Sequence, residues 1–304
     1  MSKSTLNVIG ELMNNSYGRA RKAWQARNVA GYQELARLQT DLGASYLTLN
    51  VDGTQKLPVT LQEMLEFLPR VIPAIQEVTD VPISFDNPEI TFHRECLKHF
   101  TPAKSRGRPI LNSISVSRKN IPEMIQLAKE HEMSVIVMAS ECLLPDGSHG
   151  PAKAVAQVLN TAKHFVSLLH QAGIDNERIL IDPGLAPVAS DTSGLINLCL
   201  DSIRAIRSES SLAGVHLLVG LSNFAIGAPK PMQIPLERAF LCLAIEAGLD
   251  FALSNPEKNT VPMSGEDKLV KDLSQILAMG RVRDGESQED AGFRQLTALM
   301  ELWN

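Results

Sequence analysis

The sequence lacks long apolar runs, and it has no excess of basic residues. No stretch reaches the roughly 18 apolar residues of a membrane-spanning helix, so we expect no membrane span. The first residues contain no apolar core of the length that a signal peptide needs. Lys and Arg number 29 against 34 Asp and Glu, which gives a net charge of -5. Because nucleic-acid binding needs a clustered basic surface, nucleic acid is not an expected partner.

Cysteine is scarce and histidine is scattered. The four cysteines, Cys96, Cys142, Cys199 and Cys242, lie far apart and form no CxxC pair. We therefore expect reduced thiols in a cytoplasmic protein rather than a disulfide framework. None of the 7 histidines belongs to an HxH or HxxxH pair, so no metal site is expected.

Two common signatures of enzymes are also missing. The run GLSNF around Ser222 departs from the GxSxG nucleophile elbow because its fifth residue is Phe224. No GxGxxG follows the first strand-like run, which disfavours a dinucleotide-binding sheet. His149 lies in a predicted loop, where we expect it to be exposed to solvent.

Apolar residues make up 44% of the chain, and they gather in short runs typical of buried strands. Each run is followed by a longer segment with helical spacing. The strand-like runs are Asn7–Leu12, Tyr46–Val51, Pro82–Asp86, Ile110–Ser115, Ser134–Ser140, Ile179–Asp182, His216–Leu221 and Phe251–Ser254.

The segments between these runs predict helices. Pro69 and Pro73 are expected to bend the second predicted helix or to end it early, because proline lacks the amide hydrogen that a helix uses. Glycine follows or closes several of the predicted helices, as is common at helix ends. The clearest helical segments are Ala30–Gly43, Leu61–Val78, Ala152–Gly173, Leu195–Arg207 and Leu236–Gly248.

This strand–helix alternation predicts a parallel sheet with helices packed on it. Eight such units favour a closed (β/α)8 TIM barrel, with an open doubly wound sheet as the alternative. We expect one domain over residues 1–304. Residues 281–304, with a charged stretch before the apolar run FRQLTALMELW, are expected to form a C-terminal helical extension.

Polar residues stand repeatedly where the predicted strands end. In a (β/α)8 barrel these ends meet at one mouth, where the active site lies. A single Asp or Asn at such a place often caps a helix or makes a turn, but seven strands with polar ends favour a ring of hydrogen-bonding groups. The residues are Glu11, Asn14, Asn50, Asp52, Asp86, Asn87, Asn112, Ser113, Asp182, Gly220, Ser222, Asn223, Ser254 and Asn255.

The predicted mouth is rich in carboxylates and amides and poor in His, Lys and Arg. A carboxylate accepts two parallel N–H bonds from an amino-pyrimidinone edge, while amides supply donors and acceptors. A phosphate or carboxylate substrate would call for Arg, Lys or a glycine-rich nest. The composition therefore indicates a neutral, flat heterocycle as the ligand.

The runs GELMN, LTLNV, SFDN, LNSIS, ILIDP and VGLSN, in this order, resemble the pterin-binding barrel family. This family includes dihydropteroate synthases and methyltetrahydrofolate:corrinoid protein methyltransferases. GELMN, LNS and GLSN are more similar to the methyltransferases. The resemblance extends from about Val8 to Asn255.

The resemblance implies roles for particular residues. Asp86, Asn112 and Asp182 would bind the polar edge of the pterin, and Asn223 would contact N5. Gly220 and Ser222 would shape the pocket floor, and Glu11, Asn14 and Asn50 would be further pterin contacts. Asn223, Asp86 and Asn112 are the expected catalytic residues, with a proton reaching N5 through water from Asp86 or Asn112.

The implied reaction moves a methyl group between a corrinoid and N5 of tetrahydrofolate, and it could form methyltetrahydrofolate in a demethylase system. Tetrahydrofolate or methyltetrahydrofolate would be the substrate, and a partner protein would carry the corrinoid. A homodimer is also implied. The alternatives are a dihydropteroate synthase, whose Lys signature near the seventh strand and Arg signature near the eighth are missing here, and a non-catalytic pterin-binding protein.

Four positions depart from the methyltransferase pattern. Thr48 stands where many members have aspartate, and Leu12 replaces the arginine of their GERxN run. Ile226 replaces a polar residue, and Lys230 is the nearest substitute for a later arginine. These departures favour an unusual partner or direction of transfer.

Overall fold

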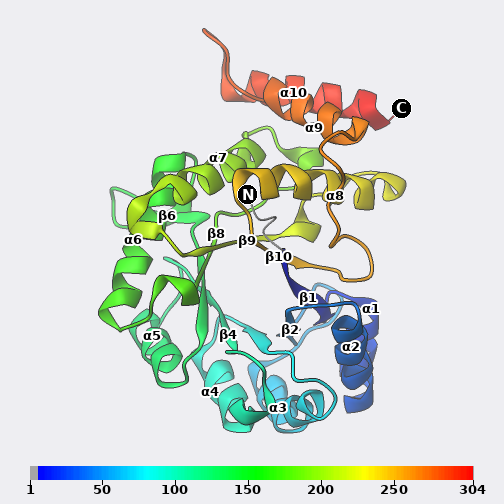
Figure 1. The fold of residues 1–304 in the computed structure, drawn as a ribbon, viewed down its shortest axis with the longest axis vertical. Helices are drawn as coiled ribbons and strands as arrows, with labels where there is room; N and C mark the ends of the chain where they lie inside the picture. The colour runs from blue at the N-terminus through cyan, green and yellow to red at the C-terminus, as the bar shows by residue number, and fades with distance from the viewer. Residues whose placement is uncertain (1–5, 304) are drawn as a thin grey trace.

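A computed structural model describes residues 6–303, and its centre is a closed barrel of parallel strands (Figure 1). Neighbouring strands follow the order β1-β10-β9-β8-β5-β4-β3-β2, which closes on itself. The predicted (β/α)8 TIM barrel is thus confirmed. Its strands are β1 (Asn7–Asn14), β2 (Tyr46–Asn50), β3 (Ile83–Asp86), β4 (Ile110–Ile114), β5 (Ser134–Met138), β8 (Ile179–Asp182), β9 (His216–Gly220) and β10 (Phe251–Ser254).

The lower part of the barrel interior is filled by apolar side chains from several strands. Ile9, Ile110, Ile136, Leu180, Leu218 and Phe251 form a cluster separate from the main core. Because side chains alternate across a strand, the residue two positions later points inward again. Ile110 is therefore followed on the inner face by Asn112, and Leu180 by Asp182. The alternation alone sets these polar groups above an apolar floor.

Helices form a ring around the barrel and bury its outer face (Figure 1). The extra helix α1 comes between β1 and the first helix that the sequence predicts. The helices that follow the strands are α1 (Gly18–Gln25), α2 (Val29–Asp41), α3 (Leu61–Gln76), α4 (Ile90–His99), α5 (Ile121–Glu130), α6 (Val155–Gln171), α7 (Leu195–Ser208) and α8 (Lys230–Ala247). Short 3-10 turns are η1 (Pro102–Lys104), η2 (Asn176–Arg178), η3 (Val188–Ser190), η4 (Ser210–Leu212) and η5 (Leu221–Asn223).

Two helices differ from their predicted extents. Helix α3 continues through Pro69 and Pro73 to Gln76, so the prediction of an early end is wrong. A capping box between Thr60 and Glu63 fixes its first turn, and its apolar face is buried, which outweighs the loss of two amide donors. Helix α8 starts six positions before the predicted Leu236; Pro231 fits in its first turn, and Pro235 lies inside the helix.

A short antiparallel hairpin follows β5, where the sequence indicated only a loop. Its strands are β6 (Glu141–Leu143) and β7 (His149–Pro151), and His149 is exposed. The amide of Ala152 donates to the carbonyl of Ser140 at 2.8 Å, which closes the base of the hairpin. The hairpin stands at the carboxyl end of the barrel because it begins where β5 ends.

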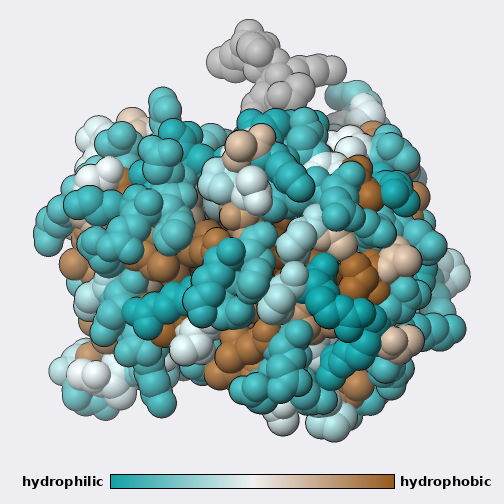
Figure 2. All heavy atoms as spheres, turned by 90° about the horizontal axis from the view of Figure 1, so that it is seen from below, coloured by the Kyte–Doolittle hydropathy of each residue, from teal (hydrophilic) through white to brown (hydrophobic). Residues whose placement is uncertain are grey.

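The C-terminal part of the chain forms α9 (Lys268–Met279) and α10 (Gln288–Trp303), which pack on each other, while α9 also packs on α8 (Figure 1). The charged stretch that starts at residue 281 joins them, and its last three residues begin α10. The face of the molecule in Figure 2 is mostly hydrophilic, with hydrophobic patches between the hydrophilic side chains. Within residues 6–303, no helix is long and apolar enough to cross a membrane.

Candidate functional site

The carboxyl ends of the strands bring four predicted site residues to the mouth of the barrel. Asp86 and Asn112 are direct neighbours in the register of β3 and β4. Asp182 is the last residue of β8, and Asn223 lies in the η5 turn that follows β9. Asp182 and Asn223 line one cavity of about 400 Å³. This volume is in the range of pockets that hold small organic ligands.

The carboxylate of Asp86 is held by a neighbouring amide. Nδ2 of Asn50 donates to Oδ2 of Asp86 at 3.0 Å. The pKa of Asp86 is raised to about 6, chiefly because the carboxyl is buried; the charge of Asp52 also raises it, while the Asn50 hydrogen bond and the charge of Arg118 lower it. Asp86 is thus a carboxylate that ionises near neutral pH and has one oxygen left for a ligand.

Asp182 has a similar environment across the barrel. The amide of Gly184 donates to Oδ1 of Asp182 at 2.8 Å, and burial raises the pKa of Asp182 to about 6. Leu185, Leu195 and Leu198 supply an apolar wall to the same cavity. A flat ring that offers N–H donors to the carboxylate and a hydrophobic face to the leucines would fit this arrangement.

The amides of Asn112 and Asn223 are available to a ligand. Neither side chain makes a hydrogen bond with any other residue in the described range 6–303. Asn112 is only 9% exposed, so a hydrogen-bonding ligand would relieve the cost of its burial. Asn223 is exposed and folds back over Gly220, where an added Cβ would lie 2.9 Å from Nδ2 of Asn223.

Glu11 lies beneath the mouth rather than at its surface. It is 5% exposed, and its carboxylate accepts hydrogen bonds from Ser222 Oγ at 3.0 Å and from Tyr17 Oη at 2.5 Å. Burial raises the pKa of Glu11. Since both of its oxygens are engaged, Glu11 holds Ser222, the residue next to Asn223.

A second buried carboxylate lies close to Glu11. Nδ2 of Asn259 donates to Oε2 of Glu237 at 2.7 Å. Burial raises the pKa of Glu237, and the charge of Glu11 raises it further. Repulsion between the two carboxylates favours a proton on one of them.

Asn14 forms a turn, which is a common role for an asparagine at the end of a strand. Its Oδ1 accepts the amide of Ser16 at 2.8 Å, directly after the end of β1. It remains half-buried beside Asn50 in the register of β1 and β2. Thr48, one of the departures from the methyltransferase pattern, is fully buried, and its hydroxyl has no hydrogen-bond partner among the described residues.

Sequence reasoning missed Arg118 and the contacts around Asp52. Nδ2 of Asn87 donates to Oδ1 of Asp52 at 2.7 Å. The charge of Arg118 lowers the pKa of both Asp52 and Asp86, and its buried Nε has no hydrogen-bond partner among residues 6–303. Arg118 follows β4 in a loop, where no periodic pattern marks a residue that turns back toward the mouth.

The carboxylate at the hairpin, Glu141, was missed as well. It lines the same cavity as Asp182 and Asn223. The sequence did not indicate Glu141 as a site residue because the segment after β5 has no strand-end motif. Among residues 6–303, no group of three or more His, Cys, Asp and Glu side chains is arranged to hold a metal ion.

An apolar floor, two carboxylates with raised pKa values and unpartnered amides give the mouth the chemistry that suits a small polar heterocycle. The sequence profile of the family described as "Pterin binding enzyme" matches residues 11–254, which includes every strand end at this mouth. The chain therefore belongs to the pterin-binding enzyme family.

Two curated relatives carry the name dihydropteroate synthase. The protein from Bacillus subtilis is 25% identical over 261 residues, which cover 82% of this chain and 81% of that protein. The protein from Synechocystis is 27% identical over 204 residues, which cover 63% of this chain and 64% of its own length.

Solved structures with the same fold also carry that name. The Xanthomonas albilineans dihydropteroate synthase superposes with a TM-score of 0.60 at 21% identity, covering 83% of this chain and 88% of that one. The Thermus thermophilus synthase in complex with 4-aminobenzoate has a TM-score of 0.57 at 20% identity, covering 91% and 95%. At these identities the likeness shows the fold.

Proposed function

We propose that this protein is a transferase that acts on a reduced pterin bound at the barrel mouth. The observation that carries the proposal is the convergence of Asp182 and Asn223 on one cavity, with Asp86 and Asn112 on neighbouring strands of the same rim. A pterin presents an amino-pyrimidinone edge to carboxylates and amides, and a flat ring to apolar walls. The membership of the chain in a pterin-binding family supports this ligand.

Within this proposal, each residue has a defined task. Asp86, Asn112 and Asp182 bind the polar edge of the ring, and Asn50 orients Asp86 through its 3.0 Å hydrogen bond. Asn223 contacts N5, held over Gly220. Ser222 and Glu11 support the η5 turn from below. Asn14 stabilises the turn after β1.

The first candidate reaction is that of a dihydropteroate synthase, the name of both curated relatives. The synthase would join 4-aminobenzoate to a pterin whose diphosphate departs. Arg118, with its unpartnered buried Nε, is a cation near Asp86 that could attract the anionic leaving group. This reading has more support from the relatives than methyl transfer has.

The second candidate is methyl transfer between N5 of tetrahydrofolate and a corrinoid carried by a partner protein. The observation that favours it is the chemistry of the last two strand ends. β9 leads into Ser222 and Asn223, and β10 into Asn255, so hydroxyl and amide groups rather than Lys or Arg stand directly at these two strand ends. Lys230 and Lys258 come later in the chain. The Asn223 amide can donate to or accept from N5, which suits a nitrogen that gains or loses charge.

One experiment separates these candidates. The purified protein is incubated with a pterin diphosphate and 4-aminobenzoate, and separately with tetrahydrofolate and methylcobalamin. Formation of dihydropteroate supports the synthase, while loss of the cobalt–carbon absorbance supports methyl transfer. Binding of the pterin with neither turnover would contradict both reactions and leave a binding protein.

A variant tests the role of Asn223. Asn223→Ala should lower turnover by about 10²-fold in either reaction, since removal of one preorganised hydrogen bond to a reacting group has this effect. The pterin dissociation constant should change much less. Unchanged turnover in a folded variant would remove Asn223 from the mechanism.

The assembly and compartment are also proposals. We infer a homodimer, as the resemblance to the family implies, and a cytoplasmic location. Cys96, Cys142, Cys199 and Cys242 are free and buried, which suits a reducing compartment. Light scattering of the purified protein measures the oligomeric state directly.

A further inference from the structure

We propose that Glu141 is a catalytic carboxylate that takes the proton released when a nitrogen nucleophile is alkylated in the mouth cavity. The proposal rests on the proposed function, and it names a residue from the hairpin after β5. Glu141 lines the cavity that Asp182 and Asn223 also line. These three residues come from three separate segments at the carboxyl end of the barrel, namely the β6–β7 hairpin, the end of β8 and the η5 turn.

Glu141 has an unused hydrogen-bonding atom in this position. Its Oε2 is buried and has no hydrogen-bond partner among residues 6–303. Leaving a carboxylate oxygen buried and unpaired is costly, so a rotation of the Glu141 side chain that turns this oxygen toward a ligand or water in the cavity relieves that cost. Glu141 and Asp182 are the two carboxylates that line this cavity.

The backbone fixes Glu141 relative to Asp182. The amide of Ala139 donates to the carbonyl of Asp182 at 2.7 Å. Gly184 approaches Ser140 so closely that an added Cβ would lie 2.5 Å from the Cβ of Ser140. The chain on both sides of this contact is therefore held in place, and Glu141 follows one residue later.

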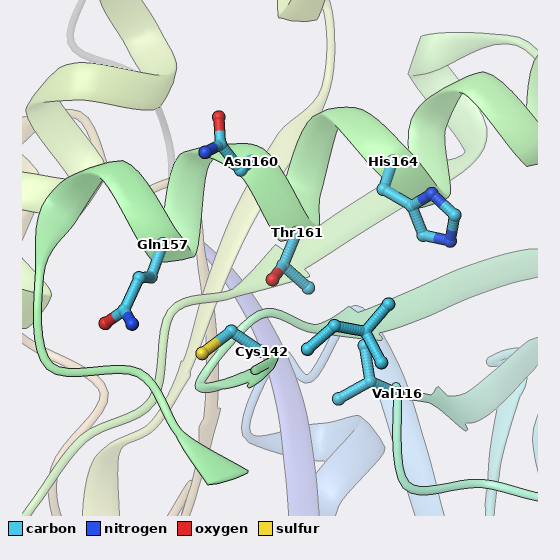
Figure 3. A pocket seen from close by; sticks show the side chains of 7 residues that line it. Val116, Cys142, Gln157, Asn160, Thr161 and His164 are labelled. Atoms are coloured by element: carbon cyan, nitrogen blue, oxygen red, sulfur yellow. The ribbon is translucent and has the colours of Figure 1, made fainter. Parts of the chain in front are cut away.

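Strand β6 borders two cavities. Glu141 lines the mouth cavity, while Cys142 and Leu143 line a second cavity of about 250 Å³ together with Thr161 and His164 of α6 (Figure 3). His164 therefore belongs to the α6 side, and it does not line the mouth cavity.

Both candidate reactions need a proton acceptor at this place. In the condensation, the amine nitrogen bonds to the pterin methylene carbon, the C–O bond breaks, and diphosphate leaves with the electron pair. In methyl transfer to tetrahydrofolate, N5 bonds to the methyl carbon, and the cobalt–carbon pair stays on cobalt. In each case the alkylated nitrogen must lose its proton, and the Glu141 carboxylate receives it.

Asp182 is less suited to this task. One of its oxygens accepts the Gly184 amide at 2.8 Å, and the other is assigned to the ring edge. Glu141 has no role in binding the ring edge. If Glu141 accepts the proton, Asp182 can keep the ring bound while the proton leaves.

The test compares Glu141→Gln with wild type and with Asp146→Asn, a matched control at the exposed tip of the same hairpin. We expect Glu141→Gln to lower kcat by about 10²-fold or more, while the pterin dissociation constant stays within about twofold. Glu141→Asp should recover part of kcat, and Asp146→Asn should behave as wild type.

Four outcomes would overturn the proposal. A kcat of Glu141→Gln close to that of wild type shows that Glu141 takes no proton. Equal losses in Glu141→Gln and Asp146→Asn, or a loss confined to pterin binding, show a structural role. Wild-type protein that neither binds pterin nor turns over contradicts the proposed function itself, and this inference with it.

Discussion

Two carboxylates with raised pKa values give the mouth its chemistry. Asp86 and Asp182 lie at the ends of β3 and β8, and burial raises the pKa of each to about 6. Each is ionised at neutral pH and close to its own titration. An ionised carboxylate accepts the two N–H donors of an amino-pyrimidinone edge, and a protonated one loses part of this capacity.

Pterin binding should therefore weaken as the pH falls below about 6. Protonation of Asp86 or Asp182 in the free protein competes with the ligand, so affinity should drop by up to about tenfold per pH unit for each carboxylate. Calorimetric titration between pH 5 and 8 measures this dependence. Asp182→Asn should bind weakly at pH 8 and lose much of the slope; a flat profile in wild type would place the pterin elsewhere.

Gly220 provides the space that Asn223 needs. An added Cβ would lie 2.9 Å from Nδ2 of Asn223, closer than real Cβ contacts come. Gly220→Ala should push the amide away from its present position and lower turnover by about tenfold or more, because small misplacements at a reacting group cost rate. Steady-state kinetics and a thermal melt together would show this. An active Gly220→Ala variant would mean that the position of this amide is unimportant.

How much of the site could be predicted depends on how local each signal is. Asn112 and Asp182 follow an inward apolar residue by two positions, so strand periodicity places them at the mouth. Glu11 has the same local pattern, but its burial depends on Tyr17 and Ser222, which lie on other elements. Glu141 and Arg118 lie in loops, where contacts between distant segments leave no periodic trace.

At the scale of elements, the loops after β8 and β5 define the cavity, and the C-terminal helix supports one of them. Asp191 accepts the amide of Leu195 at 2.9 Å and that of Ile196 at 2.9 Å, which satisfies two free amides in the first turn of α7. The side chain of Gln295 on α10 reaches the carbonyl of Asp191 at 3.4 Å. Helix α10 therefore reaches the loop whose other end lines the mouth.

The contact of α10 with this loop depends on Gly292. An added Cβ would lie 2.3 Å from the carbonyl oxygen of Thr192, and backbone cannot move aside as a flexible side chain can. Gly292→Ala should lower the free energy of unfolding by about 1–3 kcal/mol, the usual cost of overpacking. Denaturant unfolding measures it. Ala298→Gly on the same helix controls for helix propensity, and a Gly292→Ala variant as stable as wild type would contradict the docking of α10.

The alternation of strands and helices in the barrel could be predicted from the sequence, while the β6–β7 hairpin and the full extent of α3 could not. Runs such as ILIDP are continuous in apolar residues because their strands are buried on both faces. The hairpin of β6 and β7 has strands of 3 residues each, too short for a periodic pattern to show. The prediction that Pro69 and Pro73 bend or end the helix considered only the local sequence. Helix α3 continues because its apolar face is buried against the rest of the barrel, which the local sequence does not reveal.

At the scale of the whole molecule, the buried carboxylates of the site lower the stability of the folded protein at neutral pH. Asp86 and Asp182 have folded-state pKa values of about 6, above the ordinary value of an aspartate. The native protein therefore binds protons between pH 7 and 5 that the unfolded chain does not, and its stability should rise as the pH falls through this window.

We expect this gain to be on the order of 1 kcal/mol for each carboxylate in the ligand-free protein. Thermal melts at pH 7, 6 and 5 would show a rising midpoint. Asp86→Asn and Asp182→Asn should each be more stable than wild type at pH 7 and should show a smaller dependence on pH. Stability that falls steadily from pH 7 to 5 would contradict the burial of these carboxylates.

The most direct test of the site is a crystal structure of the wild-type protein with a reduced pterin. We expect the amino-pyrimidinone edge within hydrogen-bond distance of Asp86, Asn112 and Asp182, and N5 next to the amide of Asn223. A pterin seated away from the carboxyl ends of the strands, or no ring density at saturating concentrations, would contradict the assignment of this mouth as a pterin site.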